Sequence, residues 1–272
     1  MIRVAYLGPE GTHSHDAALA HYGESATLVP FSDIPSAVAA VGAELVDQAI
    51  VPIENSTEGS VTVTTDLLIA RDAPSIVGEM ILRVRHHLIA RPGTRLNDIE
   101  RVISIGQASA QCRNFLRDQL PGAQVFPAVS TAAAVASCVH SERLAAIGSE
   151  AAARLYGMAV IAPDIQDNAD NATRFVILGR DAPQSSGRDR TSLVFSLAAD
   201  RPGGLLAALR PFADRGINLS RIESRPTKAT LGNYWFLIDC EGHLDDKPVA
   251  DAVAEVRNIA VELRVLGSYP RA

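Results

Sequence analysis

The stretch QDNADNATRFVILG, residues 166–179, is polar over its first nine residues and apolar over the rest. Its second half predicts a buried strand that Gly179 ends, and this strand completes the first part of the chain. Thr173 and Arg174 stand where the strand begins. The start of a strand does not require such a pair, although Thr173 could simply cap the preceding turn. We therefore expect both side chains to project from a strand end and to form part of a functional site.

Outward from this stretch, residues 1–180 alternate strand-like apolar runs with helical patterns. That alternation predicts an α/β domain. Residues 181–190 have the proline, glycine, serine and charge content of a linker. Residues 191–272 predict the order βαββαβ, which is the ferredoxin-like arrangement of a compact second domain.

Length and charge exclude several classes of protein. The chain has 272 residues and a formal net charge of −6. Its length suggests about two domains. Without a basic stripe it is not expected to bind nucleic acid, and its apolar runs are far shorter than the ~20 residues of a membrane span. The first residues lack the features of a signal peptide, so we expect a cytoplasmic protein without a membrane partner.

Cysteines and histidines predict neither disulfides nor a metal site. Cys112, Cys138 and Cys240 are odd in number and widely spaced, which favours reduced and mostly buried thiols. His13 and His15 are close in sequence, but no cluster of Asp, Glu or Cys residues accompanies them. We therefore expect no metal.

Several junctions between a strand and a helix carry hydroxyl or amide side chains. Thr12 follows one predicted strand, and Ser56 or Thr57 is expected to cap the helix after another. Helix N-termini bind anions without needing lysine, which would suit a small carboxylated ligand, although capping alone also explains these residues. Glu54 and Asn55 extend the second junction beyond what a turn requires.

Three motifs in the first 180 residues resemble those of the prephenate dehydratase family. They are Gly-Pro-Glu-Gly-Thr at 8–12, Pro-Ile-Glu-Asn-Ser at 52–56 and Thr-Arg-Phe at 173–175. The last 82 residues resemble the family's regulatory ACT domain, with a Glu-Ser-Arg-Pro motif at 223–226. The resemblance implies a catalytic domain of two α/β lobes, similar to a type 2 periplasmic-binding-protein fold, followed by a ferredoxin-like ACT domain.

The resemblance implies a carbon–oxygen lyase that converts prephenate to phenylpyruvate, carbon dioxide and water in phenylalanine biosynthesis, without a cofactor. Thr173 matches the family's catalytic threonine, which would donate a proton to the departing hydroxide. Asn55, Ser104 and Gln111 would hydrogen-bond the substrate, with Glu54 supporting them, although Glu54 could instead be a carboxylate at a helix start. The expected substrate-binding residues are Thr12, Ser56, Thr57, Arg174 and Phe175. Arg174 could pair with a substrate carboxylate or with a neighbour such as Asp170.

The second domain would bind phenylalanine as a feedback effector, as the resemblance implies. The expected contacts are Gly203, Gly204, Leu205, Asn218, Glu223, Ser224, Arg225 and Pro226. Such domains usually pair across a dimer interface, so a homodimer or homotetramer is expected. The glycines and leucine alone would also fit a tight turn before a core helix.

One departure from the family pattern keeps other functions open. Ile105 and Gly106 replace the usual His-Pro of the third junction. An arogenate dehydratase and a non-aromatising prephenate decarboxylase therefore stay possible. A two-lobed protein that binds a carboxylate or amino acid without catalysis is an alternative of another class.

Overall fold

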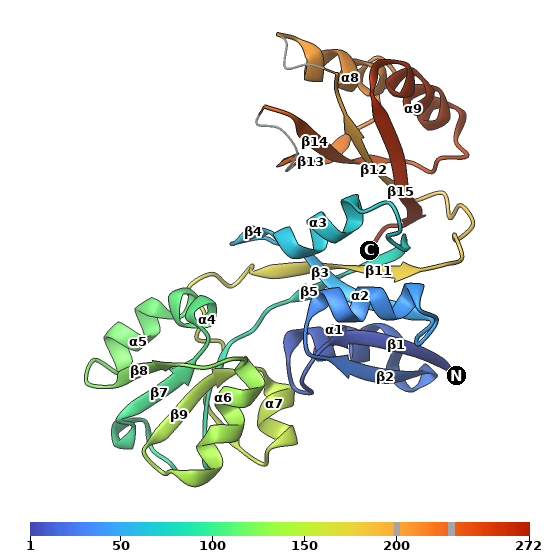
Figure 1. Ribbon diagram of the computed structural model, residues 1–272. Coiled ribbons are helices and arrows are strands. Elements are labelled where there is room, and N and C mark those ends of the chain that lie inside the picture. The colour runs from blue at the N-terminus through green and yellow to red at the C-terminus, as the bar shows by residue number, and fades with distance from the viewer. Residues whose placement is uncertain (199–201, 228–231) are drawn as a thin grey trace. The chain divides into compact units, whose positions relative to one another are not determined.

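The computed structural model describes residues 1–198, 202–227 and 232–272 (Figure 1). Contacts between residues divide the chain into two compact units. Unit 1 consists of residues 1–37, 50–61 and 81–175. Unit 2 consists of residues 38–49, 62–80 and 176–272. The predicted domain ends at 180 and 190 stay a prediction.

The first sheet has the strand order β2-β1-β3-β11-β5, and a short strand, β4, pairs with β3. Its strands are β1 (Ile2–Leu7), β2 (Ala26–Phe31), β3 (Gln48–Asn55), β4 (Gly59–Ser60), β5 (Ser75–Arg83) and β11 (Ala172–Gly179). The helices that follow its strands are α1 (His13–Tyr22), α2 (Ile34–Gly42) and α3 (Thr62–Ile69). The order places β3 beside β11, although 116 residues separate Asn55 from Asn171 in the chain.

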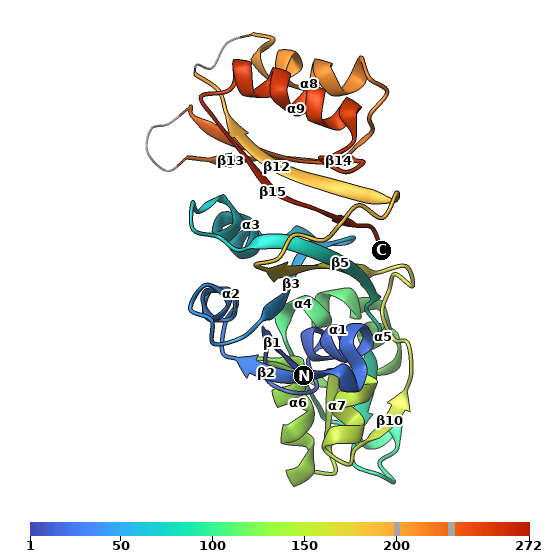
Figure 2. The same ribbon diagram turned by 90° about the vertical axis from the view of Figure 1, so that its right-hand side faces the viewer.

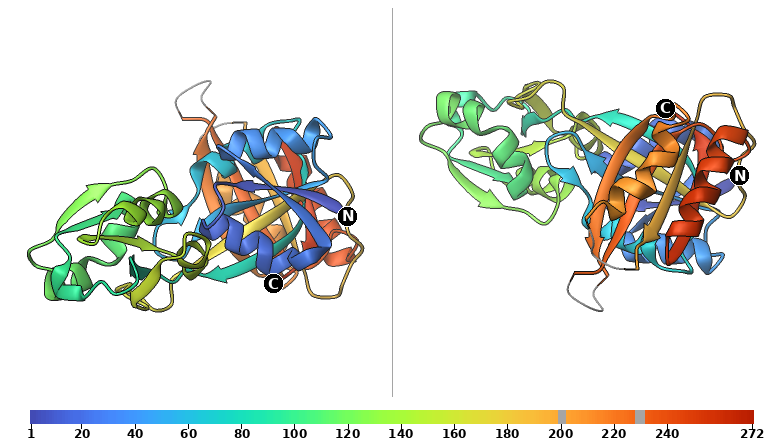
Figure 3. Two further views of the ribbon diagram at one scale, coloured as in Figure 1. Left: turned by 90° about the horizontal axis from the view of Figure 1, so that it is seen from below. Right: turned by 90° about the horizontal axis from the view of Figure 1, so that it is seen from above.

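The second sheet lies in unit 1 and has the order β10-β6-β9-β7-β8 (Figure 3, left). Its strands are β6 (His87–Ala90), β7 (Arg101–Ser104), β8 (Gln124–Pro127), β9 (Leu144–Gly148) and β10 (Ala159–Ala162). Side chains alternate along these strands, so Leu88 packs in one apolar cluster and Ile89 in another. The helices are α4 (Gly106–Gln111), α5 (Arg113–Gln119), α6 (Thr131–Ser137) and α7 (Glu150–Leu155). The sheet is therefore apolar on both faces, as expected for a sheet between helices.

The third sheet lies in unit 2 and is antiparallel, with the order β13-β14-β12-β15. Its strands are β12 (Asp189–Ser196), β13 (Leu219–Pro226), β14 (Tyr234–Glu241) and β15 (Glu262–Pro270). The helices α8 (Gly204–Ala213) and α9 (Lys247–Ile259) contact each other and cover one face of the sheet (Figures 2 and 3). Leu193, Phe195 and Ile238 pack under them. This arrangement confirms the predicted βαββαβ domain, and the whole chain is α/β as expected.

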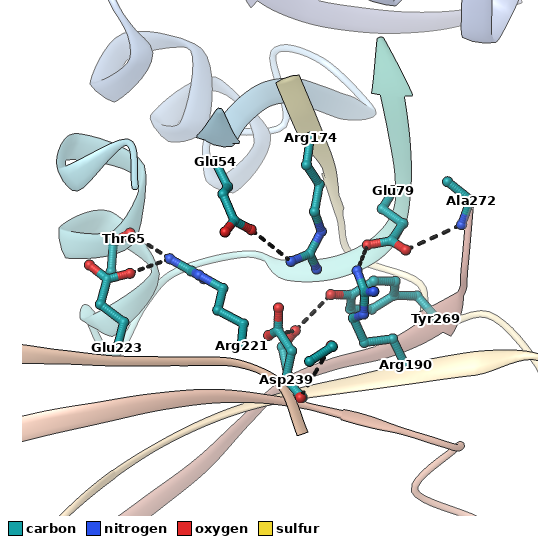
Figure 4. Close-up of polar contacts among 12 residues, drawn as sticks. Glu54, Thr65, Glu79, Arg174, Arg190, Arg221, Glu223, Asp239, Tyr269 and Ala272 are labelled. Atoms are coloured by element: carbon teal, nitrogen blue, oxygen red, sulfur yellow. Dashed lines mark hydrogen bonds and ion pairs between the residues drawn. The ribbon is translucent and has the colours of Figure 1, made fainter. Parts of the chain in front are cut away.

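The other face of the third sheet buries charged side chains within unit 2 (Figure 4). Arg190 on β12 forms an ion pair with Glu79 on β5, and both side chains are buried. Arg221 on β13 donates to Glu223 and to the Thr65 hydroxyl on α3, 3.3 Å away. Arg264 on β15 donates to the carbonyl oxygens of Ile69 and Ala70, 2.8 and 2.7 Å away, which satisfies acceptors at the end of α3.

Gly267 lets β15 pass close to β5. A Cβ atom at this position would lie 2.0 Å from the carbonyl oxygen of Ile76, which is far inside van der Waals contact. Only a residue without a side chain fits there, so the packing of β15 against β5 depends on this glycine.

Two expectations about local structure needed revision. The single helix expected over "QASAQCRNFLRDQL" is two helices, because Cys112 leaves helical geometry with φ −115° and ψ 19° between α4 and α5. Ser56 and Thr57 do not cap a helix, because β4 follows them and α3 begins only at Thr62. The three cysteines are free and buried, as predicted. Among the described residues, no helix is long and apolar enough to cross a membrane.

Candidate active site

Asn55 and Thr173 lie against each other at neighbouring ends of β3 and β11. The side-chain amide of Asn55 donates through Nδ2 to Thr173 Oγ1 at 3.0 Å and to Asn171 Oδ1 at 2.8 Å. All three side chains are buried. The sequence predicted Asn55 and Thr173 as partners in one site, and the structure brings them together.

The backbone fixes the orientation of the Asn55 amide. Its Oδ1 accepts hydrogen bonds from the backbone N–H groups of Thr57 and Glu58, each at 3.0 Å. A backbone N–H can only donate, so the oxygen must face this turn and Nδ2 must face Thr173. Thr173 Oγ1 is therefore the acceptor in this contact, and its own proton is not used in it.

A chain of hydrogen bonds continues from Asn171 to Gln111, the last residue of α4. Asn171 Nδ2 donates to Gln111 Oε1 at 2.9 Å, and His86 Nε2 lies 2.8 Å from the same oxygen. Gln111 Nε2 donates to Glu58 Oε1 at 3.1 Å. Burial lowers the pKa of His86 to about 4, with the charge of His13 as a further cause. His86 is therefore neutral near pH 7.

A pocket of about 200 Å³ adjoins this chain of hydrogen bonds. It is lined by Thr57, Glu58, Ala110, Gln111, Gln166, Asp167, Asn168 and Asn171. Asn55 and Thr173 are not among the lining residues but connect to the pocket through Asn171. Among the described residues, no cluster of three His, Cys, Asp or Glu side chains could hold a metal ion.

Ser56 and Thr57 belong to the same cluster by their contacts with the stretch before β11. The backbone N–H of Ala172 donates to Ser56 Oγ at 3.0 Å. Thr57 Oγ1 donates to Asn171 Oδ1 at 3.3 Å. Both hydroxyls therefore hold the start of β11 beside the turn that follows Asn55.

Three further predicted site residues make contacts elsewhere in unit 1. Ser104 is buried at the end of β7, and its hydroxyl donates to the carbonyl oxygen of Ile105 at 3.2 Å. Thr12 caps α1 by accepting from the backbone N–H of His15 at 3.3 Å. Phe175 lies on β11, and its side chain is buried in the apolar core. The contacts of these residues do not join the network around Asn55.

Glu54 and Arg174 form a separate ion pair. Arg174 Nη1 lies 3.8 Å from Glu54 Oε2, and Figure 4 shows the two side chains pointing toward each other. Neighbouring residues on a strand point to opposite faces of the sheet, so this pair lies on the face opposite Asn55 and Thr173. Arg174 thus has Glu54 as one partner, a pairing that the sequence analysis did not predict.

Sequence reasoning missed Asn171, His86 and Glu58. Asn171 stands two residues before Thr173, a spacing that places both side chains on one face of a strand, so this signal was available. Glu58 lies in a turn, where the sequence gives no sign of a role in a site. His86 belongs to none of the recognised motifs, and only the fold brings it to Gln111.

The predicted phenylalanine-binding residues are not assembled within one chain. Gly203 precedes α8 in a left-handed conformation with φ 80°, and it is followed by Gly204 and Leu205. Asn218 lies beyond the other end of this ten-residue helix, which spans about 15 Å. Its Nδ2 donates to Glu241 Oε1 at 3.3 Å.

The charged residues of the Glu-Ser-Arg-Pro motif already have partners in unit 2. Arg225 donates through Nε and Nη2 to Asp66 Oδ1 on α3, at 3.0 and 2.8 Å, and Glu223 pairs with Arg221. Ser224 and Pro226 alternate with these residues along β13 and are exposed.

The chain combines α/β sheets that carry a buried cluster of amides and a hydroxyl with a ferredoxin-like second domain. A model of the prephenate dehydratase family matches residues 4–183, and a model of the ACT domain matches residues 191–258. The chain belongs to the prephenate dehydratase family, and it is therefore an enzyme of the lyase class.

Individual relatives agree with this assignment. A prephenate dehydratase of Mycobacterium tuberculosis (strain H37Rv) is 39% identical over 282 residues, which cover 99% of this chain and 87% of that protein. The crystal structure of a prephenate dehydratase from Arthrobacter aurescens in complex with L-Phe is 42% identical, with a TM-score of 0.92 over 100% of this chain and 90% of that one. A structure described as a novel type of quorum-quenching acylase is 29% identical, with a TM-score of 0.90 over 99% and 98% of the two chains.

Proposed function

We propose that this enzyme converts prephenate to phenylpyruvate with loss of carbon dioxide and water. The observation that carries the proposal is the contact between Asn55 and Thr173, in which the amide donates and the hydroxyl accepts at 3.0 Å. The Thr173 proton is thereby left for a substrate oxygen. A hydroxyl so placed suits a reaction whose difficult step is the departure of hydroxide.

In the proposed reaction, the bond between the ring and its carboxylate breaks and its electron pair enters the ring. The ring becomes aromatic and expels hydroxide, which takes a proton from Thr173 and leaves as water. Asn55 Nδ2 stabilises the negative charge that develops on Thr173 Oγ1. A proton from solvent then restores the threonine. No cofactor is required in this proposal, because aromatisation drives the step.

The position of Arg174 supports this mechanism. A cation held on the leaving carboxylate would stabilise the substrate more than the transition state that releases carbon dioxide. Arg174 is paired with Glu54 on the other face of the sheet, away from Thr173. Side chains of the Asn55 network are amides and hydroxyls, with Glu58 and the neutral His86 at its far end. Ser104 and Thr12 stay proposed substrate contacts.

An acylase activity, which the name of one structural relative raises, is not favoured by this site. An acylase that used Thr173 as a nucleophile would need a base to accept its proton. The partner that the structure gives Thr173 Oγ1 is the Asn55 amide, which donates. The contact is oriented for proton donation by Thr173.

A turnover assay with prephenate tests the proposal, with products identified by mass. We expect phenylpyruvate from the wild-type enzyme. A decarboxylated product that keeps its hydroxyl would establish the non-aromatising decarboxylase instead. Faster turnover of arogenate than of prephenate would identify arogenate as the preferred substrate. Ligand binding without turnover of either compound would contradict the catalytic proposal.

We further propose that phenylalanine regulates the enzyme at the ACT domain. Two observations support this: a solved relative is described in complex with L-Phe, and Gly203 and Asn218 lie at opposite ends of α8. A second copy of the chain would bring one end of α8 to the other end of its partner and complete the site. The proposed assembly is a homodimer or homotetramer. The cytoplasmic location stays a prediction.

The regulatory proposal is tested by phenylalanine titration of activity and by sedimentation. We expect Asn218→Ala to abolish the phenylalanine response while leaving turnover unchanged. A monomer that still responds to phenylalanine would contradict the shared site.

A further inference from the structure

Asn171, the residue before β11, is buried with an exposed fraction of 1%, and both its amide oxygen and its amide nitrogen form hydrogen bonds. Its Oδ1 accepts from Asn55 Nδ2 at 2.8 Å and from Thr57 Oγ1 at 3.3 Å. Its Nδ2 donates to Gln111 Oε1 at 2.9 Å. Because the backbone fixes Asn55, the orientation of Asn171 is fixed in turn, and so is that of Gln111.

Glu58, at the other end of the chain of hydrogen bonds, fixes the same orientation of the Gln111 amide independently. Glu58 is a carboxylate that can only accept when ionised, so Gln111 must present Nε2 to it and Oε1 to the other side. That oxygen then accepts from both Asn171 Nδ2 and His86 Nε2. His86 therefore carries its proton on Nε2, and among the described residues its buried Nδ1 has no hydrogen-bond partner.

We propose that Gln111 is a positioning residue, which acts through Asn171 to hold the Asn55–Thr173 pair rather than by contacting the substrate. The inference rests on the proposed function. Gln111 Oε1 is fully used by its two donors, and Asn171 Oδ1 takes one of the two Asn55 Nδ2 hydrogens. The other hydrogen is left for Thr173 Oγ1 at 3.0 Å, which lies closer to Nδ2 than the remaining acceptor, the carbonyl oxygen of Ala172 at 3.3 Å.

Exchanging the amide of Gln111 and the carboxylate of Glu58 between the two positions tests whether Gln111 positions Asn171 or contacts the substrate. Gln111→Glu keeps the acceptor that faces Asn171 and His86 but places a second carboxylate against Glu58. We expect kcat to fall about 10- to 100-fold, with KM changed much less, because repulsion between the two carboxylates moves residue 111 away from the buried Asn171 amide, which then lacks its acceptor. Glu58→Gln combined with Gln111→Glu restores one amide and one carboxylate, and the amide introduced at position 58 is then the donor. This double variant is expected to recover most of kcat.

Two results would overturn the inference. One is a folded double variant, with wild-type melting temperature, that is as slow as Gln111→Glu alone, because Gln111 would then act as a donor to the substrate. The other is a loss that appears in KM rather than in kcat.

A measurement without turnover keeps this test separate from the proposed function. Nitrogen-15 NMR of the histidine rings of the wild-type enzyme is expected to show His86 protonated on Nε2 and bare on Nδ1. The opposite tautomer would reverse Gln111 and refute the inference, whatever the substrate is. Absence of prephenate turnover together with the expected tautomer would refute the proposed function and leave the orientation of the network established.

Discussion

Two buried polar regions of this chain use different chemistry. The network from Thr173 to His86 in unit 1 consists of hydroxyls, amides and a neutral imidazole, with one carboxylate at its end. The polar face of the third sheet in unit 2 joins strands and α3 through arginines and carboxylates. In the first region, the Asn55 amide is oriented by the backbone and donates to Thr173 Oγ1, so the Thr173 hydroxyl proton is not used in that contact. Charged groups hold segments together but depend on both partners being present.

The largest expected effect comes from removing the hydroxyl at the neutral centre. Thr173→Ala should lower kcat about 10²- to 10⁴-fold, which is the usual range for a positioned proton donor. Thr173→Ser keeps the hydroxyl and should retain more activity. Turnover measured with prephenate for both variants, with melting temperatures as control, checks this. Equal activity of Thr173→Ala and wild type would remove Thr173 from the mechanism.

On the polar face of the third sheet, removing one partner of an ion pair should lower stability rather than activity. Arg190→Met removes the Arg190 cation from the buried Glu79 carboxylate and should lower the free energy of unfolding by about 3–5 kcal/mol. Replacing both residues, as in Arg190→Met with Glu79→Leu, should recover most of that loss. Urea unfolding of the single and double variants measures it. If the double variant is no more stable than the single one, the ion pair is not the source of the loss.

The neutral region should show its pH response through His86. Its pKa is lowered to about 4 in the folded protein, so the unfolded chain takes up a proton first as the pH falls. Stability is therefore fully present above pH 6.5 and is lost as the pH falls toward 4. Between pH 7 and pH 5 the loss from this residue is about 2 kcal/mol.

His86→Gln keeps a donor to Gln111 but removes this titration. Urea unfolding at pH 7 and pH 5 should show a smaller pH dependence for the variant than for the wild type. The same pH dependence in both proteins would mean that His86 is not held neutral.

The smallest expected effect is at the edge of the charged region. Arg225 and Asp66 are partly exposed, so Arg225→Gln should lower the free energy of unfolding by about 0.5–1 kcal/mol. The difference from wild type should shrink in about 1 M salt, because salt screens exposed charges. Urea unfolding at low and high salt measures this difference. A difference that does not change with salt would point to lost packing of the arginine stem instead.

Sequence patterns predicted most of the elements because strands and helices alternate and their apolar periods differ. The resemblance to the prephenate dehydratase family placed Asn55 and Thr173 in one site, and each stands in a short polar motif at the end of a strand. Residues 54 and 55, and 173 and 174, were expected to act together. The period of two along a strand separates them onto opposite faces of the sheet, and this could have been predicted.

Other features lay beyond the sequence. His86 meets Gln111 across 25 residues and Asn55 meets Asn171 across 116, and no local pattern encodes such contacts. The break between α4 and α5 at Cys112 was not predicted, because the segment contains neither proline nor an internal glycine and its Ala, Gln and Arg residues favour a helix. Arg225 was expected at an effector site, and its contact with Asp66 depends on how β13 packs on α3.

Gly267 also limits how this chain can change over generations. Any single-base change that alters the amino acid of a glycine codon adds a side chain or ends the chain. At this position the first added carbon would overlap the carbonyl oxygen of Ile76. Mutations here should therefore be removed by selection, whereas a position such as the exposed Leu206 is free of this steric limit. Among homologous genes, we expect glycine to stay at this position while the surrounding sequence of β15 changes.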